Sequence, residues 1–119
     1  MARKALKSKD EYVVGKGVGV KFDQGKPEMA LMPFDALEQI SAVFTYGAKK
    51  YDADNWAHGM RWRRMASALL RHISAWMLGK DKDEESGFDH LAHAGCCLLM
   101  LYALTLRGKG EDDRFKELK

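Results

Sequence analysis

One stretch of the sequence constrains the fold more than any other, because no Lys, Arg, Asp or Glu occurs from Ala94 to Leu106. A run of this length that ends at Arg107 and Gly108 predicts a helix with apolar side chains on every face. Two further helices and one extended segment cannot cover all of these faces. We therefore expect copies of the chain to associate into a dimer or tetramer, as an oligomeric helical bundle.

The length and composition of the chain fit one globular domain. It has 119 residues, of which 46% are hydrophobic and 31% charged. We expect a flexible N-terminal arm over residues 1–12, a single helical domain over 13–108 and a C-terminal tail over 109–119. The apolar run is shorter than the roughly 18 to 20 residues that cross a membrane, and no apolar leader opens the chain, so we expect a cytoplasmic protein with no membrane partner.

The secondary-structure pattern is mainly α. The segment 14–22 alternates apolar with small or polar residues, which favours a short extended segment before a turn. Three helices follow, from about Pro33 to Ala48, from Arg61 to Leu78 and from Phe88 to Arg107. Cys96 and Cys97 lie inside the third helix, where we expect buried free thiols.

The net charge of +3 is too small to indicate duplex nucleic acid as a partner. The distribution of charge is more informative, because basic residues gather in 49–64 and acidic residues in 81–89. A phosphate-bearing ligand held together with a divalent cation uses both kinds of patch. The alternative is ordinary solvated surface at two helix ends.

Three of the four histidines fall on helix faces that we predict to be inward: His72, His90 and His93. His90 and His93 are three residues apart and project from one side of their helix, as paired metal ligands do, and Asp89 is spaced to orient the His93 ring. The sequence therefore predicts a divalent-metal site. The alternative is that each ring is a core residue satisfied by a local hydrogen bond.

Carboxylates near these helices complete the predicted site. Glu38 leaves its helix on the same side as Asp35, whose place near the helix start also suits the helix dipole. Ser86 is a candidate cap of the third helix, in the acidic loop that also carries Asp83 and Glu85. Carboxylate oxygens and phosphates suit Mg²⁺, and imidazoles shift the preference toward Mn²⁺, so we expect one of these two ions.

Aromatic rings and cations alternate around the first interhelical loop. Rings stack on bases and cations hold phosphates, so this combination suits a nucleotide. Arg71, next to His72, is a candidate to clamp phosphate or to pair with Asp83, whereas Trp62 is expected to cap the core. The candidate substrate-binding residues are Lys49, Lys50, Tyr51, Asn55, Trp56 and Arg71.

Several of these segments together resemble one known family, the phage dATP/dGTP diphosphohydrolase N-terminal domain family. The likeness covers about residues 20 to 107 and depends on the spaced combination rather than on any single motif. The segments that carry it are Lys21–Pro27, Phe44–Tyr51, Asn55-Trp56, Leu70-Arg71-His72, Asp83–Gly87 and His90–Ala94.

The resemblance implies a small phage-encoded, all-α protein in an infected host cell. It is similar in activity to MazG-like nucleotide pyrophosphohydrolases, which cut nucleoside triphosphates to monophosphate and pyrophosphate with Mg²⁺ or Mn²⁺. MazG-like enzymes carry ExxE and ExxD carboxylate pairs on facing helices. This chain instead has Asp35 and Glu38 on one helix and His90 and His93 on another.

Two classes of function follow. In the first, the chain is a metal-dependent nucleoside triphosphate pyrophosphohydrolase of the dATP/dGTP type, with catalytic Glu38 and Glu85 and metal ligands His72, His90, His93 and Glu38. In the second, the same pocket sequesters a nucleotide without cutting it. A structural protein with core histidines is the third alternative, and a structure in which the three histidines lie far apart would favour it.

Overall fold

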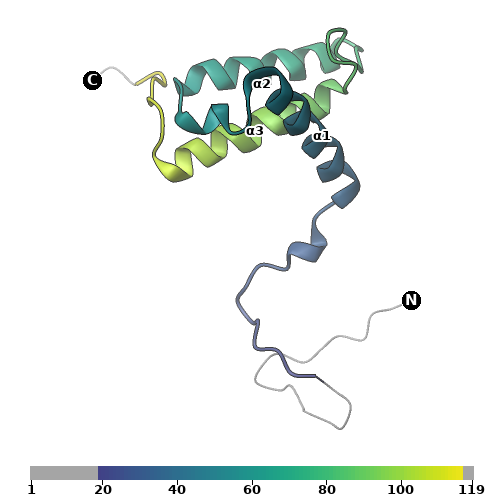
Figure 1. Ribbon diagram of the computed structural model, residues 1–119, viewed down its shortest axis with the longest axis vertical. Coiled ribbons are helices and arrows are strands. Elements are labelled where there is room, and N and C mark those ends of the chain that lie inside the picture. Colours follow the sequence, from purple (N-terminus) through teal and green to yellow (C-terminus); the bar gives the residue numbers. More distant parts are fainter. Residues whose placement is uncertain (1–18, 117–119) are drawn as a thin grey trace. The chain divides into compact units, whose positions relative to one another are not determined.

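The computed structural model describes residues 19–116 and is mainly helical, as predicted. Figure 1 shows its three α-helices, α1 (Phe34–Tyr51), α2 (Trp62–Met77) and α3 (His90–Arg107). Two short 3-10 helices, η2 (Met29–Leu31) and η3 (Asn55–His58), precede α1 and α2. The described range contains no β-strand.

The chain divides into two units, residues 1–32 and 33–119. The described part of the first unit begins without regular structure, makes a turn in which the Lys26 N–H donates to the Asp23 carbonyl at 3.0 Å, and continues into η2. The predicted arm over residues 1–12 and most of the predicted extended segment lie outside the described residues. The predicted boundaries at residues 12 and 108 stay predictions, whereas the division in the structure follows Met32.

Helix α1 is longer and starts later than the sequence predicts. Pro33 is its N-cap and not its first residue, and the Asp35 carboxylate in the first turn accepts the Ala36 N–H at 2.8 Å. The helix continues through Gly47 to Tyr51, and Lys49 and Lys50 in its last turn suit the carboxyl end of the helix dipole. The helix stops at Asp52, whose φ of 78° lies in the left-handed region.

Helix α2 matches its predicted range to within one residue at each end, but α3 starts two residues later than predicted. The two ends of the loop between α2 and α3 are hydrogen-bonded to each other before the helix begins. The Asp83 N–H donates to the Phe88 carbonyl and the His90 N–H to the Asp81 carbonyl, both at 2.8 Å. Asp89 is therefore the N-cap, and the predicted capping role of Ser86 is wrong.

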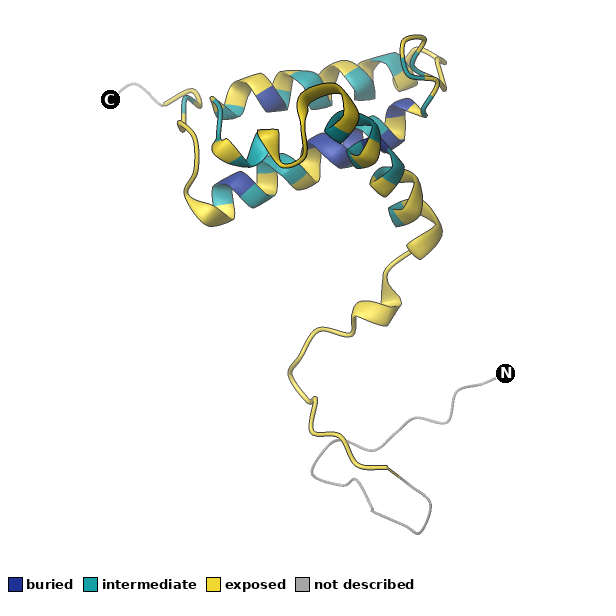
Figure 2. Ribbon diagram, viewed as in Figure 1, coloured by how far each residue is buried: buried dark blue, intermediate teal, exposed yellow. Residues whose placement is uncertain are grey.

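The core of the second unit forms where α1 and α2 pack on α3. Val43 of α1 is buried against Ala92 and Cys96 of α3, and Cys96 and Cys97 are buried free thiols, as predicted. Gly95 makes this close approach feasible, because a Cβ atom there would lie 2.5 Å from Ile40 Cδ1. Figure 2 shows the buried residues concentrated on α3. Trp76 of α2, which its helical spacing from Met65, Leu69 and His72 predicts to face inward, is exposed.

Residues after α3 pair with the start of α2. The Trp62 N–H donates to the Glu111 carbonyl at 3.0 Å, and the Trp62 indole donates to the Lys109 carbonyl at 2.9 Å. Trp62 thus covers this end of the core, as predicted. Gly110 has a φ of +85° and lies directly against the Met60 backbone, where a side chain would collide.

One face of α3 is largely exposed in the described part of the chain. It consists of large apolar side chains that are each at least 42% exposed. We call this surface the apolar face of α3; its residues are Leu91, Leu98, Leu99, Tyr102 and Leu106. The sequence predicts that α3 needs a further partner to cover it, and the exposed apolar face of α3 is the surface such a partner would cover. Association of copies of the chain stays a prediction.

Helix α3 is also the one described helix that is long and apolar enough, by length and composition alone, to cross a membrane. The core helix of a soluble protein passes the same test. Helix α3 carries most of the buried core residues of the second unit, and two histidines lie in its first turn.

We expect Leu104→Ala to destabilise the fold by about 2 to 5 kcal/mol, because Leu104 is 0% exposed and its truncation leaves a cavity in the core. Urea denaturation followed by circular dichroism measures the free energy of unfolding. Leu70→Ala, at a side chain that is 63% exposed, is the matched control and is expected to cost less than about 1 kcal/mol.

We also expect the apolar face of α3 to bind the same face of a second copy. Replacing both Leu98 and Tyr102 by Lys places two like charges in that interface and should shift sedimentation at micromolar concentration from dimer or tetramer to monomer. Lysines introduced at the exposed Ser67 and Ser74 of α2 provide the charge-matched control. A wild-type chain that sediments as a monomer would contradict the expected interface.

Candidate functional site

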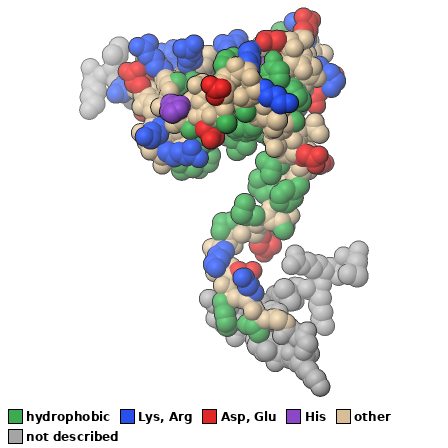
Figure 3. Space-filling model, in the orientation of Figure 1, with side chains coloured by type: hydrophobic (Ala, Val, Ile, Leu, Met, Phe, Trp, Pro, Cys, Tyr) green, Lys and Arg blue, Asp and Glu red, His purple; other side chains and the backbone are tan. Residues whose placement is uncertain are grey.

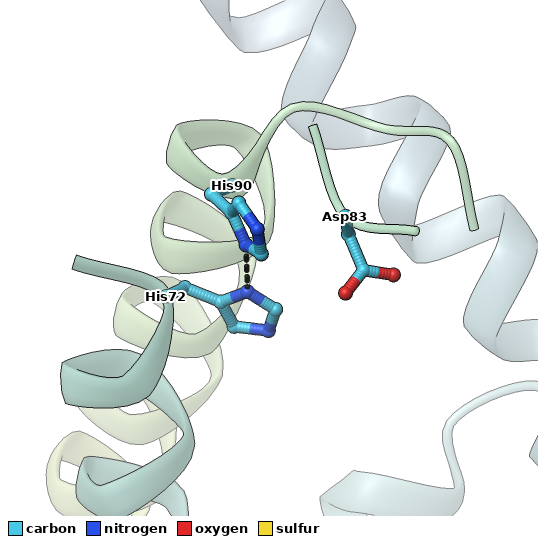
Figure 4. Close-up of side chains that lie close together, drawn as sticks. All are labelled: His72, Asp83 and His90. Carbon is cyan, nitrogen blue, oxygen red and sulfur yellow. Dashed lines mark hydrogen bonds between the residues drawn. The ribbon is translucent and has the colours of Figure 1, made fainter. Parts of the chain in front are cut away.

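The three histidines that the sequence placed on inward faces do meet. We call His72, His90 and His93 the histidine cluster. His72 comes from α2, and its Nδ1 lies 2.9 Å from Nδ1 of His90 at the start of α3, as Figure 4 shows. One of these nitrogens donates the proton and the other accepts it, since a neutral imidazole has one of each.

His93, one turn further along α3, stacks on His72. The ring centroids are 4.5 Å apart and the planes differ by 7°. Nε2 of His93 lies 2.6 Å from the Ser86 hydroxyl and 3.9 Å from the Asp83 carboxylate. Asp89, the predicted orienting partner, instead pairs with Lys82 at 3.2 Å, so Ser86 takes the orienting position.

Asp83 is held by a turn that it forms with Ser86. Its Oδ2 accepts the Ser86 N–H and the Ser86 O–H, both at 2.9 Å. The Ser86 hydroxyl in turn accepts the Phe88 N–H at 3.2 Å. The acidic loop is therefore ordered around one carboxylate, and that carboxylate lies beside the histidine cluster (Figure 4).

Three of these side chains form a candidate set of metal ligands. One ligand atom each from His72, Asp83 and His90 lies within 4.8 Å of the others. Two imidazole nitrogens and one carboxylate oxygen are a donor set that fits Mn²⁺ or a later transition ion better than Mg²⁺. His93 is outside this set, and Glu38 is exposed on α1.

Burial sets the protonation of the cluster. Desolvation lowers the pKa values of His72 and His93, and the neighbouring rings lower them further. Desolvation raises the pKa of Asp83, but the hydrogen bonds from Ser86 and the adjacent histidines outweigh it, so this pKa lies below its usual value. At neutral pH His72 and His93 are therefore neutral imidazoles beside an ionised Asp83 carboxylate, and neutral imidazole and ionised carboxylate are the forms that bind a metal.

A cavity of about 810 Å³ opens beside the histidine cluster. Its size falls within the range of ligand-binding sites. His72 and His93 line it, together with Arg64 and Arg71 of α2. Of the other predicted substrate-binding residues, Tyr51, Asn55 and Trp56 also line it.

The remaining predicted cations lie outside this cavity lining. Lys49 is exposed, and the Lys50 ammonium pairs with Glu85 at 2.6 Å, a contact that raises the pKa of Lys50. Lys50 also lies over the Tyr51 ring, 5.2 Å from its centroid. Figure 3 shows basic side chains over α2 and acidic ones around the loop between α2 and α3.

The structure thus brings together part of the predicted site. His72, His90 and His93 converge, whereas Glu38 and Glu85 are exposed and their roles stay predictions. Sequence reasoning gave Ser86 the wrong role and did not include Asp83 among the ligands. The spacing of Asp83 and Ser86, typical of a side-chain-capped turn, was the available signal.

The fold and the site define a small helical domain with a histidine–aspartate cluster beside a ligand-sized cavity. The family model described as "dATP/dGTP diphosphohydrolase, N-terminal" matches residues 16–114. The chain belongs to this family, in agreement with the resemblance that the sequence motifs indicated.

One curated relative illustrates the family. A protein of Salmonella phage PMBT28, named dATP/dGTP diphosphohydrolase, is 34% identical to this chain over 96 residues. The match covers 81% of this chain and 33% of the relative, so the chain spans about a third of the length of that protein. No solved structure matches.

We expect the metal-free fold to lose stability as the pH falls below about 6.5, the usual histidine pKa. The unfolded chain then binds more protons than the native one, because the native pKa values of His72 and His93 are lowered, so the free energy of unfolding falls with pH until both rings are protonated. Urea denaturation between pH 7.5 and 5 in the presence of a chelator measures this slope.

The exposed His58 supplies the control for this prediction. His58→Gln should leave the slope unchanged, whereas replacing both His72 and His93 by Gln should flatten it. A free energy of unfolding that is constant over this pH range in the wild type would contradict the expectation.

Proposed function

We propose that this chain is a metal-dependent nucleotide diphosphohydrolase that cuts a nucleoside triphosphate of the dATP/dGTP type to monophosphate and pyrophosphate. Family membership and the name of the phage relative support this class of reaction. The observation that carries the proposal is the cavity, which joins the histidine cluster to arginines and aromatic rings.

The cavity offers partners for both parts of a nucleotide. Arg71 directly precedes His72 on α2, and together with Arg64 it supplies cationic donors for the phosphates near the histidine cluster. Trp56 supplies an aromatic surface for the base; Arg107 lies 5.2 Å over its ring and Phe44 packs against it edge-on. Asn55 adds an amide that donates and accepts hydrogen bonds.

His72, Asp83 and His90 would hold the metal ion, with Mn²⁺ favoured over Mg²⁺ by the two imidazoles. When bound, such an ion lowers the pKa of a coordinated water and offsets charge that develops on the phosphates. Asp83 keeps its carboxylate ionised through the two Ser86 hydrogen bonds. His90 is buried, so its ring is held in place beside His72.

The test is hydrolysis of the common deoxynucleoside triphosphates by purified protein with Mn²⁺ or Mg²⁺, with monophosphate and pyrophosphate separated by ion-exchange chromatography. We expect His90→Ala to lower metal content per subunit and to reduce kcat/KM at least tenfold, because a metal ligand is lost. His58→Ala, at an exposed histidine, is the matched control and should keep both.

Calorimetry separates hydrolysis from simple nucleotide sequestration. Nucleotide binding without product in the metal-loaded wild type would support the sequestering alternative and contradict the proposed reaction. Wild-type metal stoichiometry in a folded His90→Ala variant would contradict the proposed ligand set.

A further inference from the structure

We propose that Ser86 and Asp83 are positioning residues that fix His93 as its Nε2–H tautomer, and that His93 Nδ1 accepts the proton of the attacking water. This inference rests on the proposed function and assigns a residue to its proton transfer. Asp83 and Ser86 come from the loop before α3, and His93 comes from the first turn of α3.

The count of protons in this group fixes the tautomer. Asp83 Oδ2 accepts the single hydroxyl proton of Ser86 at 2.9 Å, and it also accepts the Ser86 N–H. The hydroxyl has no second proton to give to His93 Nε2, which lies 2.6 Å from it. His93 Nε2 must therefore be the donor in this contact, so the lone pair of the neutral ring is on Nδ1.

That lone pair is accessible. His93 Nδ1 makes no hydrogen bond with the described residues, and no buried side-chain nitrogen or oxygen among them lacks a partner. Nδ1 is therefore not completely enclosed, although the His93 side chain is only 13% exposed. His93 lines the cavity beside His72.

Packing holds the ring in this orientation. His72 stacks on one face of His93 at a centroid distance of 4.5 Å. Tyr46 and Phe88 pack against His93 in T-shaped arrangements, with ring centroids 6.4 and 6.2 Å from its own. The ring cannot flip without breaking the Ser86 hydrogen bond and losing the stacking. A proton acceptor that is fixed before substrate binds requires little reorganisation during the reaction.

The proton transfer to His93 accompanies attack of water on the α-phosphorus. A water molecule transfers one proton to His93 Nδ1 while its oxygen forms a bond to the α-phosphorus. The bond from that phosphorus to the bridging oxygen breaks, and its electron pair stays on the leaving pyrophosphate. His93 then releases the proton to solvent, which restores the starting tautomer.

The first test is NMR spectroscopy of the metal-free full chain with ¹⁵N-labelled histidine, at a pH where the rings are neutral. Correlations between the ring nitrogens and carbon-bound protons distinguish the two tautomers, and His93→Gln assigns the signals. We expect the wild type to show Nε2–H at His93 and Ser86→Ala to show a mixture. An Nδ1–H tautomer in the wild type would overturn the proposal.

The second test is kinetic. Ser86→Ala should lower kcat about 10- to 100-fold and change KM less than twofold, because the loss concerns positioning and not substrate binding. Ser86→Thr keeps the hydroxyl and should recover most of kcat. Ser74→Ala, at an exposed serine of α2, is the control and should match the wild type.

The outcomes distinguish a failure of the positioning role of Ser86 from a failure of the proposed hydrolase function. A wild type that hydrolyses nucleotides while a folded Ser86→Ala variant keeps full kcat would overturn the role of Ser86 alone. A wild type without turnover would overturn the proposed function and the catalytic part of this inference, and the tautomer measured by NMR would still decide whether Ser86 positions His93. Circular dichroism of each variant shows that it folds.

Discussion

The close packing of α3 against its two neighbours is the constraint on which the rest of the structure depends. Five of six consecutive residues near its start are small enough to be covered by another helix, and the sixth is a histidine; the segment runs from Ala92 to Cys97. Because α1 approaches Gly95 so closely that Ile40 occupies the space of a Cβ atom, the helices leave no room for larger side chains. Helix α2 also packs on α3, and the Nδ1 atoms of His72 and His90 lie 2.9 Å apart there.

This packing also explains why the polar groups lie at one end of α3. The helix has no charged side chain before Arg107, and its two histidines stand in the first turn, where the acidic loop arrives. Each polar contact there has a local partner: His72 with His90, and His93 with Ser86. Buried polar groups that are paired in this way add specificity to the fold at little cost in stability, since none of them is left unsatisfied.

The sequence predicted the helices and the convergence of the histidines because both depend on helical periodicity. Knowing that His72, His90 and His93 lie on inward faces is enough to expect them near one another once the helices pack. The late start of α3 and the role of Ser86 depend on loop hydrogen bonds, including the contact between Asp83 N–H and the Phe88 carbonyl, which periodicity does not encode. The prediction that Ser86 caps α3 was based on local residue propensity alone, and it was wrong because the helix begins later.

Among the predicted substrate-binding residues, too, some positions follow from the sequence pattern and others depend on tertiary structure. Periodicity and composition located Tyr51, Asn55 and Trp56 around the cavity, but the continuation of α1 past Gly47 decided where its last side chains lie. Lys50 therefore meets Glu85 at the loop. A pairing between two exposed groups depends on tertiary placement, and the sequence offered no spacing rule for residues that lie 35 positions apart.

The donor set has a consequence for how charge is balanced in the proposed reaction. Neutral imidazoles contribute no negative charge, so His72 and His90 attract a second cation less than a pair of carboxylates would. The triphosphate then needs positive charge from the protein, and Arg64 and Arg71 lie on the cavity wall of the same helix that carries His72. In the proposed reaction, α2 would provide both a metal ligand, His72, and the phosphate contacts, Arg64 and Arg71, and one helix sets their relative positions. The geometry of α2 therefore sets the spacing between His72 and the two arginines, whereas the position of the Asp83 carboxylate depends on the Ser86 turn in the loop.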